Sequence, residues 1–131
     1  MAEKVKRRSD CPISLALDIF GDKWSLLIIR DLMFLKKQTY SEFLISEEKI
    51  STNILADRLA KLENAGLIRK FRNLYSLTEK GIDLVPVMLE VVRWSADNVK
   101  KTAAPKGIVD RIKKDRQNFE SEIVGELKRL V

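Results

Sequence analysis

Basic side chains are concentrated in one short stretch near the middle of the chain. Arg69, Lys70 and Arg72 lie within four residues of one another, and no acidic residue interrupts them. Guanidinium and ammonium groups that share a tight turn without an acidic partner are suited to bind phosphate oxygens. We therefore expect this stretch to contact a polyanion.

A second set of polar side chains follows Ser51. Ser51 is of the type preferred at a helix N-cap, and the next residues, TNILADRLAKLENA, end at Gly66. At about 100° per residue, one face of this helix carries three leucines and the opposite face is mostly polar. The leucines are Leu55, Leu59 and Leu62, and the opposite face holds Asn53, Asp57, Ala60, Lys61 and Asn64. Asn, Asp and Lys can read adenine, cytosine and guanine edges respectively. The polar face is therefore able to read bases, and an ordinary solvated helix face is the alternative.

The lone cysteine, Cys11, follows a basic segment and precedes Pro12. The cations before it are Lys4, Lys6, Arg7 and Arg8. A thiol near a helix N-terminus and basic groups has a lowered pKa, which would suit a sensor of oxidants or electrophiles. The other interpretation is a small buried apolar residue at a helix start.

Residue types that most enzymes need are missing. The chain has no histidine and one cysteine, which excludes Ser-His-Asp and Cys-His nucleophiles and the usual zinc sites. Its five glycines are too scattered for a phosphate-binding loop, and its carboxylates are interleaved with Lys and Arg. We predict no enzyme, no cofactor and no metal site.

Length and charge indicate one small domain. The 131 residues are 45% hydrophobic and 34% charged, enough for one core. The longest apolar runs, 26–29 and 32–35, are far shorter than the ~20 residues of a membrane span. The first ten residues lack the apolar region of a secretion signal. We expect a cytoplasmic protein without a membrane partner, whose net charge of +6 lies in residues 1–10 and 99–131.

Apolar periodicity predicts helices over 13–20, 23–34, 41–46 and 52–65. Gly21 stands where a left-handed C-cap would close the first helix, and Asp22 can cap the second, which is apolar almost all round. Trp24 is expected in the core.

After Gly66 the apolar period changes from 3.6 to about 2. Two strand-like runs, 67–71 and 74–77, surround Arg72-Asn73 and predict a hairpin. Thr78 is expected to cap a long amphipathic helix from Glu79 towards Lys101, bent at Pro86, in which Trp94 packs.

Beyond Pro105 and Gly107, a last helix over 108–131 is expected to carry an apolar stripe. Its members are Ile108, Ile112, Phe119, Ile123, Leu127 and Leu130. Such a stripe needs a packing partner. We expect that partner to be a second copy of the chain, and folding back onto its own domain is the alternative.

The order of these elements is that of a winged helix-turn-helix: mainly α, with a small β-hairpin wing. In this arrangement the capped helix enters the DNA major groove and the wing lies against the backbone or minor groove.

Several segments resemble the HxlR type of small bacterial and archaeal transcriptional regulators, a winged-helix group related to the MarR regulators. They are CPISLALDIFGDKWSLLIIRDL, TYSEF, ISTNILADRLAKLENAGLI and YSLTEKG, and together they span roughly residues 11–95. The resemblance implies a winged helix-turn-helix extended by N- and C-terminal helices that form the contact of a homodimer, with one recognition helix per subunit on an inverted-repeat operator. It also implies a role for Cys11, since some relatives sense through a cysteine at this position.

The chain departs from the family in three places. Its wing is very short, Thr39 stands where a basic residue is common, and the recognition helix carries Ala56, Asp57 and Ala60 in place of longer polar residues. Lys36 and Lys37 lie near Thr39 and could replace the missing cation.

The sequence thus predicts a basic tail (1–10), a winged-helix domain (11–104) and a C-terminal dimerisation helix (105–131). Its expected partners are double-stranded DNA and a second copy, and no feature identifies a small-molecule or oxidant effector. The predicted DNA-binding residues are Lys36, Lys37, Ser41, Ser51, Thr52, Asn53, Asp57, Lys61, Asn64, Arg69, Lys70 and Arg72. The alternative function is a winged-helix protein-interaction module that does not bind DNA.

Overall fold

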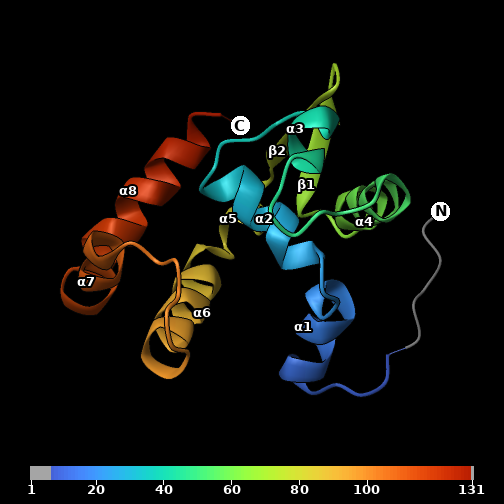
Figure 1. Cartoon of the computed structure of the whole chain (residues 1–131). Helices are drawn as coiled ribbons and strands as arrows, with labels where there is room; N and C mark the ends of the chain where they lie inside the picture. The colour runs from blue at the N-terminus through green and yellow to red at the C-terminus, as the bar shows by residue number, and fades with distance from the viewer. Residues whose placement is uncertain (1–6, 131) are drawn as a thin grey trace.

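The predicted winged helix-turn-helix is present in the computed structural model, which describes residues 7–130. In chain order its elements are α1 (Pro12–Phe20), α2 (Ser25–Met33), α3 (Tyr40–Leu44), α4 (Thr52–Asn64), β1 (Ile68–Phe71), β2 (Leu74–Leu77), α5 (Glu79–Ile82), α6 (Val85–Asn98), α7 (Lys106–Lys114) and α8 (Arg116–Lys128). Figure 1 shows α2 at the centre, α4 and the hairpin on one side, and α6, α7 and α8 on the other.

The centre of the core is α2. Asp22 was expected to cap this helix, but the N-cap is Trp24. The Asp22 carboxylate instead closes the turn that leads into α2, because it accepts hydrogen bonds from the backbone N–H groups of Trp24 and Ser25 at 2.8 and 2.9 Å. The helix packs against α4, α6 and β2. Its buried side chains meet a single cluster that includes Ile29, Leu32, Phe43, Leu55, Leu59, Leu62, Tyr75, Leu77, Val85 and Leu89.

Each helix of the helix-turn-helix begins at a side-chain cap. Thr39 accepts a hydrogen bond from the N–H of Glu42, and the Glu42 carboxylate accepts one in return from the N–H of Thr39, which is a capping box. Ser51 caps α4 by accepting from the N–H of Ile54 at 3.3 Å. The two helices are also joined directly, because the Tyr40 hydroxyl donates to the Thr52 carbonyl oxygen at 3.0 Å.

The hairpin closes at the predicted residues. Its strands are antiparallel, and Phe71 pairs with Leu74 next to the turn. Arg72 and Asn73 both have positive φ, 49° and 65°, which is the conformation of a two-residue type I′ turn. On β2, the N–H of Tyr75 donates to the carbonyl oxygen of Gln38 at 2.7 Å, so the wing is fastened to the segment that leads into α3.

Two glycines at helix ends behave differently. Gly66 has a φ of 79°. The hydrogen bond from Leu67 N–H to the Leu62 carbonyl oxygen completes a Schellman motif, which ends α4 and directs the chain into β1. Gly21 was expected to be left-handed, and this expectation is wrong, because its φ is −78°. A Cβ there would lie 2.4 Å from the Leu17 carbonyl oxygen, so close approach disfavours a side chain.

The long helix predicted from Glu79 to Lys101 is instead two helices, α5 and α6. Thr78 caps α5 as expected, by accepting from the N–H of Gly81 at 3.2 Å. Pro86 lies in the first turn of α6, where the missing N–H costs nothing, so the proline starts a helix and does not bend one. Trp94, expected to pack, is 56% exposed.

The prediction of a single C-terminal helix is also wrong, because the helix is interrupted at Asp115, which separates α7 from α8. Both fold back on their own domain, where Ile112, Ile123 and Leu127 are buried in the common core. Arg116 fastens α8 to α6 through the Glu90 carboxylate at 2.5 Å and the Pro86 carbonyl oxygen at 3.1 Å. The apolar stripe therefore has a partner within the chain, and dimerisation through 105–131 stays a prediction.

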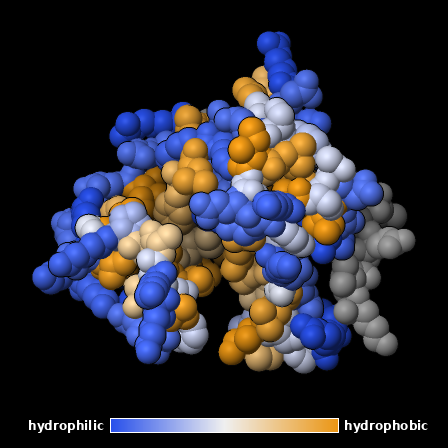
Figure 2. Space-filling view, in the orientation of Figure 1, coloured by the Kyte–Doolittle hydropathy of each residue, from blue (hydrophilic) through white to orange (hydrophobic). Residues whose placement is uncertain are grey.

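Apolar surface remains exposed on α1 and α6. No residue of α1 is buried, and Ile13 and Leu17 are 72% and 50% exposed. Val91 and Trp94 of α6 are exposed as well. Figure 2 shows apolar side chains along α1 and in the hollow between α1 and α6. In the described part of the chain, no helix has the length and apolar character that crossing a membrane requires.

Candidate nucleic-acid interface

The structure divides α4 into the two faces expected from its sequence. Leu55, Leu59 and Leu62 are buried. The opposite residues, Thr52, Asn53, Asp57, Ala60, Lys61 and Asn64, are exposed along the outer side of the helix. The helix thus presents amide, carboxylate and ammonium groups to solvent along more than two turns.

Asp57 sits at the centre of this face between two cations. Its carboxylate is paired with Lys61 at 3.3 Å and with Arg58. Hydrogen bonding to Lys61, and then to Arg58, lowers the pKa of Asp57. The negative charge of Asp57 is thereby balanced, which favours approach of an anionic ligand to this face.

Arg58 was not among the functional residues predicted from the sequence. It lies beside the exposed face, and its Nε donates to the Asp22 carboxylate at 3.0 Å, which ties α4 to the start of α2. Burial opposes the charged form of Asp22, but hydrogen bonds from Ser25, Trp24 and Arg58 outweigh it and lower the pKa of Asp22 to about 2. A basic residue one position after an acidic one on a helix gives no sequence signal for such a contact.

The wing places its three cations around the hairpin tip. Arg69 Nε donates to the Ser76 hydroxyl across the strands at 3.3 Å. Lys70 Nζ lies 5.5 Å from the centre of the Tyr75 ring, and the Arg72 guanidinium lies 5.3 Å from the centre of the Phe71 ring. All three basic residues are exposed. None of them forms an ion pair with a described residue, so their charges remain available to a polyanion.

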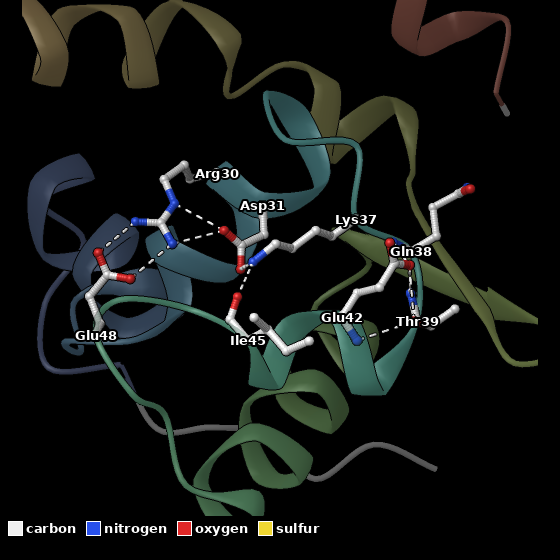
Figure 3. A network of polar contacts seen from close by, with 8 residues as sticks. All are labelled: Arg30, Asp31, Lys37, Gln38, Thr39, Glu42, Ile45 and Glu48. Atoms are coloured by element: carbon white, nitrogen blue, oxygen red, sulfur yellow. Dashed lines mark hydrogen bonds and ion pairs between the residues drawn. The ribbon is translucent and has the colours of Figure 1, made fainter. Parts of the chain in front are cut away.

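Lys37, which was predicted to contact DNA, points into the protein. Its Nζ donates to the Ile45 carbonyl oxygen at 2.6 Å and lies 3.7 Å from the buried Asp31 carboxylate (Figure 3). Arg30 reaches the same carboxylate at 2.8 Å and holds Glu48 at 2.8 Å. Hydrogen bonding to Glu48 raises the pKa of Arg30. This network fixes the connection between α3 and α4 on α2, so Lys37 helps to position α4.

Lys36 is directed away from α4. It pairs with Glu126 of α8 at 3.3 Å, on the side of the domain opposite α4 (Figure 1). Ser41 is exposed near the start of α3, with its hydroxyl 3.5 Å from that of Thr39. Ser51 is engaged as the cap of α4. The structure thus brings the predicted residues of α4 and the wing to one end of the domain and leaves Lys36 apart from them.

Cys11 is exposed at the N-cap of α1. The backbone N–H groups of Ser14 and then Ile13, at the start of α1, lower the pKa of its thiol. The sequence predicted that nearby cations would lower this pKa, but the two that the structure describes form ion pairs with carboxylates. Arg7 and Arg8 pair with Asp10 at 3.5 Å and Asp18 at 2.9 Å, and Lys4 and Lys6 lie outside the described residues.

Comparison with known proteins identifies the same arrangement. The model of the HxlR-like helix-turn-helix family matches residues 19–103. The HTH-type transcriptional regulator YdeP of Bacillus subtilis is 33% identical over 112 residues, which cover 78% of this chain and 87% of YdeP.

Solved structures agree with these sequence matches. Quinone-bound YodB from B. subtilis has a TM-score of 0.59 and 32% identity, covering 66% of this chain and 99% of YodB. The redox regulator HypR in its oxidised form has a TM-score of 0.61 and 28% identity, covering 70% of this chain and all of HypR. The family match, the curated relative and the winged fold lead to one conclusion: the chain belongs to the HxlR-like helix-turn-helix family of DNA-binding transcriptional regulators.

Proposed function

We propose that the protein binds a specific inverted-repeat operator as a homodimer, with α4 in the major groove and the wing on the backbone. The observation that carries this proposal is the pairing of an exposed polar helix face with three unpaired cations on the adjacent hairpin. The Schellman turn at Gly66 and the hydrogen bond from Tyr75 to Gln38 hold the two elements on one support. Asn53, Lys61 and Asn64 read bases in this proposal, and Arg69, Lys70 and Arg72 bind phosphates.

The dimer is supported by the uncovered faces of α1 and α6. An amphipathic helix that buries none of its residues gains little from its own domain, since most helical stability in proteins comes from packing an apolar face. A two-fold contact between two copies would cover Leu17, Trp94 and their neighbours. It would also place two recognition helices on half-sites about 34–36 Å apart, as an inverted repeat requires.

Regulation by oxidants or electrophiles is proposed to act through Cys11. Its thiol is exposed at the N-terminus of α1, where the backbone N–H groups of Ser14 and Ile13 lower its pKa and favour the reactive thiolate. Two structural neighbours, HypR in its oxidised form and YodB with bound quinone, are compatible with such chemistry. Cys11 also lies on α1, one of the helices proposed to form the dimer, so its modification would act on the dimer contact.

The test is selection of duplexes from a pool of random 30-base-pair DNA by the full chain, followed by binding isotherms on selected and scrambled duplexes. We expect tight, selective binding whose affinity falls steeply between about 50 and 200 mM salt. An enriched sequence with two-fold symmetry would support the inverted repeat. Absence of any affinity for duplex DNA would overturn the proposal in favour of a protein-interaction module.

A further inference from the structure

The tip of the wing carries two apolar side chains that its own domain does not cover. Phe71 is 69% exposed and Leu74 is 46% exposed. They are cross-strand partners next to the turn. Hairpin tips are usually polar, because an exposed phenyl ring gains nothing from water. This pair therefore calls for an occupant outside the chain.

The strand register shows why the domain cannot cover them. Side chains alternate between the two faces of a strand. Ile68, Tyr75 and Leu77 share the face that is buried in the core. Phe71 and Leu74 are on the other face, together with Arg69 and Ser76, whose side chains contact each other. The apolar pair thus points away from the core by construction.

The surroundings of the pair favour a polyanion as its occupant. Arg69 lies on the same face, Arg72 stacks over the Phe71 ring, and residues 67–78 contain no carboxylate. An apolar groove on a protein would gain nothing from three unpaired cations unless it were also acidic. Duplex DNA offers both surfaces in one place: phosphates at the groove edges, and the apolar faces of stacked base pairs between them.

We propose that Phe71 inserts as a wedge between base pairs in the minor groove, with Leu74 behind it and Arg69 and Arg72 on the flanking phosphates. This inference rests on the proposed DNA binding and adds a deformation to it. Apolar side chains inserted in this way unstack one base step and kink the duplex by about 20–90°. The wing would then select flexible steps such as TA or CA, although its turn is too short to reach far along the groove.

The experiment uses the selected duplex with 2-aminopurine placed at successive positions in the sequence contacted by the wing. Parent protein is expected to raise 2-aminopurine fluorescence at one step per half-site and to shorten the end-to-end distance in a doubly labelled duplex. Phe71→Ser should abolish both signals and weaken binding about tenfold. Phe71→Leu should retain part of each. Because Phe71 is exposed, these variants should keep the parent's thermal midpoint.

Two controls separate the wedge from other effects. A mismatch at the wedge step removes part of the unstacking cost, so it should tighten binding of the parent but not of Phe71→Ser. Leu35→Ser, which alters an exposed apolar residue between α2 and α3, should leave both signals unchanged.

The possible failures have different meanings. DNA binding by Phe71→Ser equal to the parent's, with no fluorescence rise for either protein, would overturn the wedge and leave the proposed function intact. Loss of protein self-association in Phe71→Ser without DNA would also overturn it, because the apolar pair would then face another protein. If the parent itself bound no duplex, the proposed function would fail first.

Discussion

A single carboxylate, Asp22, joins the start of the central helix to the recognition helix. It accepts from two N–H groups of α2 and from Arg58 of α4. Because folding lowers its pKa from 3.8 to about 2, its contribution to stability is complete above pH 3.8 and is lost as pH falls through 2.

We expect Asp22→Ala to lower the free energy of unfolding by about 1–2 kcal/mol at pH 7. The difference between parent and variant should shrink as pH falls from about 4 to about 2. Urea titrations across this range measure it. Glu47→Ala, which removes an exposed carboxylate between α3 and α4, serves as the control. A difference between Asp22→Ala and the parent that does not change with pH would show that the carboxylate charge is unimportant.

The Cys11 thiol makes a second prediction at this scale. Because backbone N–H groups lower its pKa, it should react with iodoacetamide faster than a free cysteine peptide at the same pH. Ser14→Pro removes the N–H that contributes most, at a first-turn position that tolerates proline, and should slow the reaction. Alkylation should change the affinity for the selected duplex, and Cys11→Ser should be insensitive.

Equal alkylation rates for the protein and the peptide would show that the N-cap does not activate the thiol. If alkylation were fast but left DNA affinity unchanged, Cys11 would be a reactive residue without a regulatory role.

Among the elements, α4 and the wing are expected to contribute different kinds of binding. Asn53→Ala should weaken binding of the selected duplex by about 1–3 kcal/mol and leave the scrambled duplex unaffected. Arg72→Asn should weaken both duplexes equally and reduce the salt slope by about one contact. Asn is the better replacement for Arg72, since it tolerates the positive φ of the turn and carries no charge. Isotherms on both duplexes across salt decide the matter, and identical profiles for the two variants would contradict this division.

Elements with strong local signals could be predicted from the sequence. The caps at Ser51 and Thr78 and the change of period after Gly66 correctly located α4, the hairpin and the start of α5. The two helix breaks were missed because periodicity does not report them. The apolar pattern continues across Pro86, and Asp115 interrupts a stripe whose phase is preserved on both sides.

The interface could be predicted only in part, for a related reason. Exposure of the α4 face follows from helix geometry, so Asn53 and Lys61 were placed correctly on the surface. Lys37 was not placed correctly, because its contact with Asp31 and Ile45 depends on how α2 meets the α3–α4 connection. Phe71 was overlooked since an apolar residue in a strand is normally assumed to be buried, and only the register reveals which face it occupies.

For the whole molecule, two predictions separate the core from the proposed dimer contact. Leu17→Glu on α1 should shift the protein from dimer to monomer at micromolar concentration without changing its far-ultraviolet circular dichroism. Ile45→Glu, at a more exposed apolar residue between α3 and α4, should remain dimeric. Sedimentation equilibrium measures both, and a dimeric Leu17→Glu would place the contact elsewhere.

Leu127→Ala should give the opposite result. Leu127 is 3% exposed, so removing its side chain leaves a cavity and should cost about 2–4 kcal/mol of unfolding free energy. The oligomeric state of the folded protein should not change. If Leu127→Ala were fully stable but monomeric, α8 would belong to the dimer contact and not to the core of its own chain.

The hydrogen bond between Tyr75 and Gln38 has a consequence for how a signal could reach DNA. It joins the wing to the segment before α3, while Gly66 joins the wing to α4. The wing and α4 are therefore held together as one unit. We do not expect a signal to release DNA by loosening only α4 or only the wing. In the proposed dimer, we expect control at the contact between the two subunits, where a displacement of one base-pair rise, about 3.4 Å, is enough to take α4 and the wing of the second subunit out of register with their half-site. That contact includes α1, the helix that begins directly after Cys11.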